Sequence, residues 1–308
     1  MNRFKKALSL ILTFLLVIGC FSACGNTDKT DSTENKNIYQ KSNPADDGEL
    51  NILMIGSSSC YYYTDELYGM LKAAGIEARV ANIYYSGCPL EKHWLWWKED
   101  QRNYDFFVLD SSGRTEQNAV GLNDCLEQYN WDYITLQESG GNVRKQALEE
   151  VLAQTATYRS ELTNYLKEQF PQSRFGWHQT WAYQIGYNRS GYKVDSLDVQ
   201  QKHYEKMKAF SEAVAKENVL ELIPSGTAWQ IARANPVIGD TLNNKMANTD
   251  YYHDGDVGGG QYLNACVWFE RITGQSCIGN TFRPSYQLPE EKIAVLQQSA
   301  HEAVQGLK

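Results

Sequence analysis

Short, largely apolar segments alternate with longer amphipathic ones along most of this chain. The apolar segments, which we predict to be strands, are 50–55, 77–85, 131–136, 173–178 and 218–223. Helical patterns occupy 61–74, 118–128, 143–168, 199–216, 226–234, 260–272 and 288–307, and Pro289 lies at the start of the last one. Apolar strands separated by helices indicate a parallel sheet that is covered on both faces. We therefore predict an α/β fold, a three-layer α/β/α sandwich with a central, mainly parallel sheet of five strands.

Residues 86–117 interrupt this alternation. We expect an irregular segment there, and its run YDFFVLDSSGRTEQ (104–117) is a candidate for a small extra hairpin. No internal repeat is visible in the chain.

The first predicted strand leads into a turn that is rich in hydroxyl groups. Residues 50–71 read LNILMIGSSSCYYYTDELYGML, with three consecutive serines between the strand and a helix. Serines tolerate turns and cap helices, so a purely structural role is one interpretation. However, ligand sites in parallel sheets lie outside the carboxyl ends of the strands, and this turn lies at such an end. The placement favours a second interpretation, in which one serine is a nucleophile presented at a helix N-terminus.

The N-terminal end reads as an export signal. MNRFKKALSLILTFLLVIGCFSACGN has a basic start, an apolar run and small residues around a cysteine. FSAC (21–24) resembles the lipobox of bacterial lipoproteins, which implies that Cys24 is the acylated first residue of the mature chain. A plain signal peptide or a single anchoring helix is the alternative. Residues 25–48 are polar and unable to bury a core, so we predict a disordered tether between the lipid anchor and a domain at 49–308.

Length, charge and cysteine spacing limit what this domain can be. Its roughly 260 residues suit a single α/β domain whose core needs no disulfides. The net charge of −8, with no basic stripe, argues against nucleic-acid binding. No CxxC pair is present, so a thiolate zinc site is unsupported and no disulfide is assigned. The cysteines outside the leader are Cys60, Cys88, Cys125, Cys266 and Cys277.

A serine hydroxyl needs a base within hydrogen-bond reach before it becomes an effective nucleophile. His203 and His301 stand in charged helical sequence, and we expect both to be solvated. His93 follows GCPLEK and His178 ends a predicted strand, so either could lie near the carboxyl edge of the sheet.

The fifth histidine, His253, has Asp250 three residues before it and a glycine-rich loop after it. Asp-x-x-His places a carboxylate beside an imidazole, where it can fix the tautomer of the ring and stabilise its protonated form. An alternative interpretation takes 253–256, His-Asp-Gly-Asp, as a Ca²⁺ loop, although the later ligands of an EF-hand are missing. The G-x-S-x-G elbow of α/β-hydrolases is absent, which excludes that family.

A turn serine after the first strand and a C-terminal Asp-x-x-His give the chain a resemblance to the SGNH (GDSL-like) hydrolases. It is most similar to an uncharacterised branch whose members begin IGNSFS. Gly56-Ser57-Ser58 aligns with Gly-Asn-Ser of the first block. The alignment implies that Ser58 is the nucleophile, with Ser57 supporting the turn in place of the usual Asn or Asp and Ser59 capping the helix. The second block's glycine, an oxyanion-hole donor through its N–H, matches Gly87 in YYSGCPLEKH.

The third block departs from the family pattern. SGNH enzymes usually supply an Asn side chain from Gly-x-Asn-Asp, whereas this chain has WDYITLQESGGN (131–142). The resemblance implies Gln137 as the third oxyanion donor, with Ser139 and Asn142 as alternatives.

The last block matches as Asp250-Tyr251-Tyr252-His253, with a longer loop before GQYL than the family pattern has. WHQTWAY (177–183) and IPSGTAWQIAR (223–233) are also similar to strings of the branch. The blocks occur in the family's order over about 50–275, which implies the flavodoxin-like fold of SGNH hydrolases.

The resemblance implies acyl transfer to water without a cofactor or metal. His253, oriented by Asp250, would remove the proton of Ser58 as its oxygen attacks an ester carbonyl. The N–H groups of Ser58 and Gly87 and the Gln137 amide would hold the oxyanion, each contributing roughly 3 kcal/mol in the transition state.

Aromatic residues suggest a glycan substrate, because flat rings with polar ends suit sugar faces. Of these rings we expect two or three to line a cleft and the rest to be core. The rings near the predicted site are Tyr61, Tyr62, Tyr63, Trp94, Trp96, Trp97, Trp177 and Trp181. Trp181, His178 and His93 are the residues that we expect to contact substrate.

We thus expect a monomeric surface esterase that removes acetyl groups from a glycan or another small ester. Lipid or aryl esters, or acetyl transfer by the same chemistry, are alternatives. A lipoprotein that binds carbohydrate through a decayed site is a further alternative, because the first and third blocks depart from the family pattern.

Overall fold

A computed structural model of the chain describes residues 48–189, 191–238, 259–285 and 288–307. The predicted signal peptide, the predicted tether up to residue 47 and the Asp250/His253 pair lie outside these ranges. The export signal, the tether and the catalytic pair therefore stay predictions. Among the helices within these ranges, none has the length and apolar character needed to cross a membrane.

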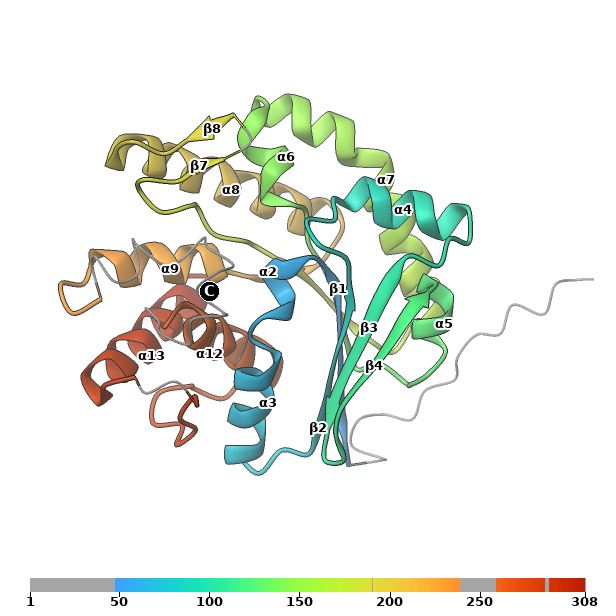
Figure 1. The fold of residues 1–308 in the computed structure, drawn as a ribbon, viewed down its shortest axis with the longest axis horizontal. Helices are drawn as coiled ribbons and strands as arrows, with labels where there is room; N and C mark the ends of the chain where they lie inside the picture. The colour runs from blue at the N-terminus through green and yellow to red at the C-terminus, as the bar shows by residue number, and fades with distance from the viewer. Residues whose placement is uncertain (1–47, 190, 239–258, 286–287, 308) are drawn as a thin grey trace, which may run out of the picture. The chain divides into compact units, whose positions relative to one another are not determined.

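Seven strands of the described residues form one central sheet (Figure 1). In spatial order they are β4 (Gly113–Val120), β3 (Tyr104–Asp110), β2 (Ala78–Tyr84), β1 (Leu50–Gly56), β5 (Tyr133–Leu136), β6 (Arg174–His178) and β9 (Glu221–Ile223). The five strands from β2 to β9 in this order are parallel, which confirms the five predicted strands. A separate two-stranded ribbon consists of β7 (Asn188–Arg189) and β8 (Tyr192–Lys193).

The predicted strand count of five is wrong because the hairpin within 104–117 is part of the main sheet. β3 pairs antiparallel with β2, from Val80 opposite Leu109 to Tyr84 opposite Asp105, and β4 pairs with β3. Tyr104, Phe106 and Val108 of β3 are buried, so the hairpin adds an apolar surface to the core. The sequence indicated the hairpin but not its strand neighbour.

The helices overlap the segments predicted to be helical, with one exception, and those at 58–61 and 140–145 begin before the predicted ranges. They are α2 (Ser58–Tyr61), α3 (Thr64–Ala73), α4 (Leu90–Lys98), α5 (Leu122–Leu126), α6 (Gly140–Lys145), α7 (Leu148–Gln169), α8 (Leu197–Glu217), α9 (Ser225–Ala234), α12 (Gly260–Thr273) and α13 (Glu290–Gln305). The exception is α4, which lies in the segment predicted to be irregular. Its sequence LEKHWLWWK is crowded with rings of modest helix propensity, and burial of Leu90, His93 and Trp96 stabilises it instead.

Two apolar cores separate the sheet from its helices and confirm the three-layer prediction. Ile52 and Met54 of β1 face one core, which α3, α9, α12 and α13 cover. Leu53 and Ile55 face the other core, which α4, α5, α7 and α8 cover. Successive residues of a strand point to opposite faces, so a strand that is apolar throughout contributes to both cores.

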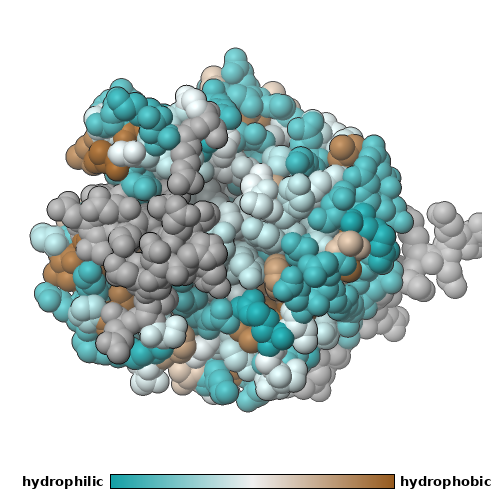
Figure 2. Space-filling view, viewed as in Figure 1, coloured by the Kyte–Doolittle hydropathy of each residue, from teal (hydrophilic) through white to brown (hydrophobic). Residues whose placement is uncertain are grey.

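The coloured surface in Figure 2 is mainly hydrophilic, with hydrophobic residues in small separate patches. The large apolar residues that are most exposed, Val219 (80%) and Leu197 (66%), lie at opposite ends of the α8 segment. Isolated apolar residues of this kind are normal on a soluble surface.

Candidate active site

The order of the strands creates a switch point between β1 and β5. From β1 the chain moves outward through β2, β3 and β4, and it then returns to place β5 on the other side of β1. The register aligns Ile55 with Leu136, and Leu136 with Trp177. Ser57, Gln137 and His178 therefore meet at the carboxyl edge of three adjacent strands. In open α/β sheets, ligands bind in the crevice at such a point.

A hydrogen-bonded chain joins these three side chains. The Nε2 of Gln137 donates to the Oγ of Ser57 at 2.8 Å, and the Oε1 of Gln137 lies 3.0 Å from the Nδ1 of His178. Because the amide oxygen can only accept, the ring proton of His178 is on Nδ1. Burial lowers the pKa of His178 to about 3, so the ring is neutral. These two hydrogen bonds fix the orientation of the Gln137 amide and leave its second N–H available.

The hydrogen bonds among Ser57, Gln137 and His178 require glycine at position 56. A Cβ atom on Gly56 would lie 2.7 Å from the Cδ of Gln137 and 2.8 Å from the Sγ of Cys60. The side chain of Gln137 thus crosses directly over the backbone at the end of β1 to reach Ser57.

The serine turn presents Ser58 at the first position of α2, with Ser57 as the N-cap. Ser57 is buried, whereas Ser58 is half-buried, and its hydroxyl has no hydrogen-bond partner within the described ranges. Ser59 lies inside α2, so the expectation that it caps the helix is wrong. The neighbouring thiol of Cys60 is buried, and desolvation raises its pKa to about 12 despite a hydrogen bond from Asn82. Cys60 is therefore protonated and a poor nucleophile.

Gly87 lies in the turn that follows β2. The turn is closed by a bond of 3.1 Å from the N–H of Cys88 to the carbonyl of Tyr85, and Gly87 has φ of +62°. Open space surrounds the position where a Cβ would be, and the residue is exposed. The geometry leaves the Gly87 backbone accessible, as the oxyanion role requires.

Glu138 is a buried acid beside Gln137 that the sequence reasoning missed. Its Oε1 accepts from the N–H of Ser139 at 2.6 Å, the N–H of Leu90 at 3.3 Å and the Nδ2 of Asn142 at 3.2 Å. Its Oε2 has no partner in the described part of the chain. Burial raises the pKa of Glu138 to about 7, and the three donors oppose this rise. Because Glu138 accepts from the N–H of Leu90 at the start of α4, it also fixes one end of the loop that carries Gly87. Its position directly after Gln137 at a strand end was the available signal.

Two more histidines are enclosed by protein. His93 is 0% exposed, stacks on the ring of Tyr104 and has its Nδ1 2.9 Å from that hydroxyl. Burial lowers its pKa to about 3, so it is a weak base, and substrate contact by His93 would need surrounding groups to move. His203 is 3% exposed, so the expectation that it is solvated is wrong. Its neighbours Lys202 and Glu205 are exposed, whereas the His203 ring faces the protein interior.

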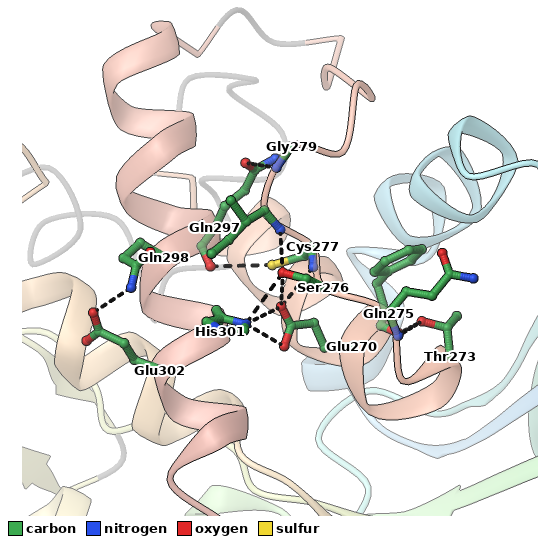
Figure 3. Close-up of polar contacts among 12 residues, drawn as sticks. Glu270, Thr273, Gln275, Ser276, Cys277, Gly279, Gln297, Gln298, His301 and Glu302 are labelled. Carbon is green, nitrogen blue, oxygen red and sulfur yellow. Dashed lines mark hydrogen bonds and ion pairs between the residues drawn. The ribbon is translucent and has the colours of Figure 1, made fainter.

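His301 lies on α13 and belongs to a separate polar network (Figure 3). Its Nδ1 is 3.0 Å from the Oε1 of Glu270 on α12, and Glu270 also accepts from the N–H of Cys277 at 2.8 Å. The end of α12 lies at the amino ends of the strands, because Arg174 at the start of β6 donates to the carbonyl of Ile272. His301 is thus at the opposite edge of the sheet from Ser58.

The aromatic residues divide into core and edge. Tyr63, Trp96 and Trp177 are buried. Trp181 is half-buried and stacks on Trp229, with ring centroids 4.1 Å apart and an interplanar angle of 13°. Trp181 is close to His178, with centroids 6.3 Å apart, so it borders the proposed site.

In the described part of the chain, neither the cysteines nor a cluster of potential metal ligands forms another candidate site. The cysteines at 60, 88, 125, 266 and 277 are all free and buried. No group of three or more His, Cys, Asp or Glu residues there could hold a metal ion. Residues 253–256 lie outside this part, so the Ca²⁺ alternative is not tested.

Comparisons with known proteins agree with this picture of the fold. The model of the family described as "Domain of unknown function (DUF4886)" matches residues 51–303. A crystal structure of a DUF4886 family protein from Bacteroides uniformis is similar, with 28% identity and a TM-score of 0.71 over 83% of this chain and 95% of that one. No curated protein matches the chain.

More distant similarities include a putative GDSL-like lipase from Parabacteroides merdae, with 12% identity, a TM-score of 0.42 and coverage of 84% of this chain and 96% of that one. A phospholipase A1 from Streptomyces albidoflavus has 10% identity and a TM-score of 0.39, over 73% and 98% of the two chains. Similarities at this level carry no weight in assigning an activity here.

Proposed function

The chain belongs to the DUF4886 family, and from this premise we propose that it is a serine ester hydrolase of the SGNH type. The observation that supports this most is the placement of Ser58. Ser58 is half-buried, lies at the switch point of the sheet and directly follows Ser57, whose hydroxyl accepts from the Gln137 amide that His178 also orients. A serine on the same turn as a fixed hydrogen-bond donor suits acyl transfer.

In the proposed reaction the Oγ of Ser58 attacks the carbonyl carbon of an ester. The carbonyl oxygen becomes an oxyanion, which the N–H groups of Ser58 and Gly87 and the second N–H of Gln137 stabilise. Because Ser57 and His178 already orient the amide, little reorganisation is needed as charge develops. Collapse of the intermediate releases the alcohol and leaves an acyl group on Ser58, which water then removes.

The base in this proposal is His253, oriented by Asp250. The histidines of the described ranges suit the role poorly, which supports this choice. His93, His178 and His203 are buried with the pKa of each lowered to about 3, and His301 is bound to Glu270 at the other edge of the sheet. Efficient base catalysis needs a pKa nearer the working pH.

We further propose that the protein acts outside the cytoplasm, anchored through Cys24, and deacetylates a glycan or another small acyl ester. Trp181 supports the glycan proposal, since its half-buried ring lies near His178 at the proposed site.

Hydrolysis of 4-nitrophenyl acetate by the full chain in detergent tests the proposal. Ser58→Ala should lower kcat by about three decades or more, because removal of the nucleophile leaves only residual catalysis. Ser59→Ala is the matched control, and it should stay within a few-fold of wild type. A fluorophosphonate should label the peptide that contains residue 58.

Wild-type turnover by Ser58→Ala would place the nucleophile elsewhere. Absence of turnover in the wild type, together with measurable binding of oligosaccharides, would favour the decayed, carbohydrate-binding alternative.

A further inference from the structure

A half-buried arginine beside the proposed site is surrounded by tyrosine rings. The Cζ of Arg144, on α6, lies 4.9 Å from the ring centroid of Tyr183, 5.6 Å from Tyr187 and 5.2 Å from Tyr192. Tyr183 and Tyr187 stack on each other, with centroids 4.1 Å apart. Rings that face a guanidinium fix its plane, while its N–H groups point outward in that plane.

The N–H groups of Arg144 are poorly satisfied by the protein. Its Nε has no acceptor in the described ranges, Nη1 lies 3.5 Å from the hydroxyl of Tyr187, and the side chain also interacts with the neutral hydroxyl of Tyr183. No carboxylate in those ranges lies within ion-pair distance of it. By contrast, the buried guanidinium of Arg159 pairs with Glu217 at 2.7 Å. Arg144 is therefore held in position without a counter-charge from the described residues.

Two more cations lie in the same region. Lys206, on α8, donates to the carbonyls of Arg144 at 3.3 Å and Gln146 at 2.9 Å. Arg233, on α9, is 8% exposed and donates to the carbonyl of Ala182 at 2.7 Å. Neither pairs with a carboxylate of the described residues. We call Arg144, Lys206 and Arg233 the cation cluster.

The charges of Arg144, Lys206 and Arg233 all affect His203. Its ring packs against Tyr183 and Tyr192, with centroids 5.7 and 5.3 Å apart, and neither ring nitrogen has a partner in the described part of the protein. Burial lowers the pKa of His203 to about 3, and the three cations of the cluster add to this effect. Burying positive charges together without an anion costs free energy, which a bound anion would offset.

The cation cluster adjoins the carboxyl edge of the sheet. A Cβ on Gly140 would lie 3.8 Å from the Oγ1 of Thr180 and 3.9 Å from the hydroxyl of Tyr183. Gly140 begins α6, which follows β5 and Gln137, and Thr180 follows His178 at the end of β6. The β7–β8 ribbon lies beside α6 and α8 (Figure 1). The cation cluster is therefore connected, through α6 and the segment after β6, to the same edge of the sheet as the switch point.

We propose that the cation cluster is a subsite for an anionic group, a carboxylate or a phosphate, on the molecule that carries the scissile ester. This inference rests on the proposed esterase function and specifies its substrate as an acidic glycan or glycan-like polymer. Arg144 is the main ligand, because its guanidinium has no carboxylate partner among the described residues and can bind an oxyanion through two N–H groups. Lys206 and Arg233 contribute charge from the adjoining helices.

Calorimetric binding to the full chain in detergent tests the subsite without relying on turnover. The probes are sodium glucuronate for a carboxylate, glycerol 1-phosphate for a phosphate, and neutral methyl glucoside. We expect at least one anionic probe to bind and methyl glucoside to bind much more weakly. The stronger of the two anionic probes identifies the source of the anion. Equal binding of all three probes, or of none, would overturn the proposal.

Variants test whether binding depends on the cluster. Arg144→Gln should weaken the anionic probe by about 10-fold or more, since a hydrogen bond to a charged group is lost. Arg102→Gln is the matched control, because Arg102 is exposed, pairs with Asp124 at 2.9 Å and is not part of the cluster. Unchanged affinity in Arg144→Gln would refute the assignment.

The salt dependence of the wild type gives an answer even if Arg144→Gln does not fold. Affinity for the anionic probe should fall as NaCl rises from about 20 to about 200 mM, whereas an uncharged contact would not respond. The same titration on Ser58→Ala separates the two proposals. Anion binding by both proteins without any turnover that depends on Ser58 would count against the esterase, and Ser58-dependent turnover by a wild type that binds neither anionic probe would count against the subsite.

Discussion

Replacing Glu138 by glutamine should change how the stability of the protein depends on pH. The substitution keeps the size of the side chain and an acceptor for the N–H groups of Ser139 and Leu90. It places an amide nitrogen where Oε2 has no partner within the described residues. The main difference is that the amide introduced by Glu138→Gln cannot ionise.

The expected magnitude follows from the pKa of Glu138, which burial raises from 4.5 to about 7. A carboxyl with a higher pKa in the folded state binds more protons there, so the protein loses stability as pH rises through this interval. At 1.36 kcal/mol per pH unit, the full interval corresponds to about 3 kcal/mol. The penalty is absent below pH of about 4.5 and complete above about 7.

Urea unfolding of wild type and Glu138→Gln at about pH 4 and about pH 8 measures this effect. The buried amide costs about 1–3 kcal/mol, but this cost is the same at both pH values and cancels. The variant should therefore gain about 3 kcal/mol relative to wild type between the two pH values. A difference between the two proteins that does not vary with pH would show that Glu138 is ionised normally in the folded state.

Three other changes test the site and its location. Gly56→Ala should abolish most activity, because its Cβ would lie 2.7 Å from the Cδ of Gln137. Gly141→Ala is the control and should be tolerated, because the nearest atom to its Cβ is 3.4 Å away. Equal loss of activity in both variants would refute the packing argument. If His253 is the base, His253→Ala should match Ser58→Ala in severity, and wild-type kcat should fall as pH drops through roughly 6.5, since an imidazole base must be neutral. Loss of activity on adding a chelator would favour the Ca²⁺ alternative instead. Cys24→Ala should leave an unacylated precursor, and an unmodified N-terminus beyond residue 24, found by mass spectrometry, would reject the lipid anchor.

The strands could be predicted from sequence because both faces of a central parallel strand are buried. β1 reads as an unbroken apolar run for that reason, with Ile52 and Leu53 in different cores. The pairing of the β3–β4 hairpin with β2 could not be predicted. An apolar face indicates that a strand is buried, but it does not indicate which strand lies beside it. Helix α4 was missed because tertiary contacts of Trp96 and His93 outweigh the local propensity of its sequence.

The candidate site was predictable as single residues and not as an arrangement. Gln137 and His178 each follow a strand, but their link to Ser57 depends on the register of β1, β5 and β6. His203 was misjudged because charged neighbours along a helix say little about the face on which one residue lies.

The outer edge of the sheet affects whether copies of the protein can associate with one another. Six consecutive residues of β4, from Arg114 to Ala119, are exposed, and β4 has one strand neighbour among the described residues. An open edge of this kind can pair with another chain and seed aggregation. Here Arg114 forms an ion pair with Asp65 at 2.8 Å, and Ala119, with φ of +56°, lies at an irregularity in the register with β3. Charge and a backbone irregularity both discourage edge-to-edge pairing, and the opposite edge, β9, is only three residues long. If the proposed lipid anchor gathers many copies on one membrane, these two protected edges would keep neighbouring molecules from joining into a continuous sheet.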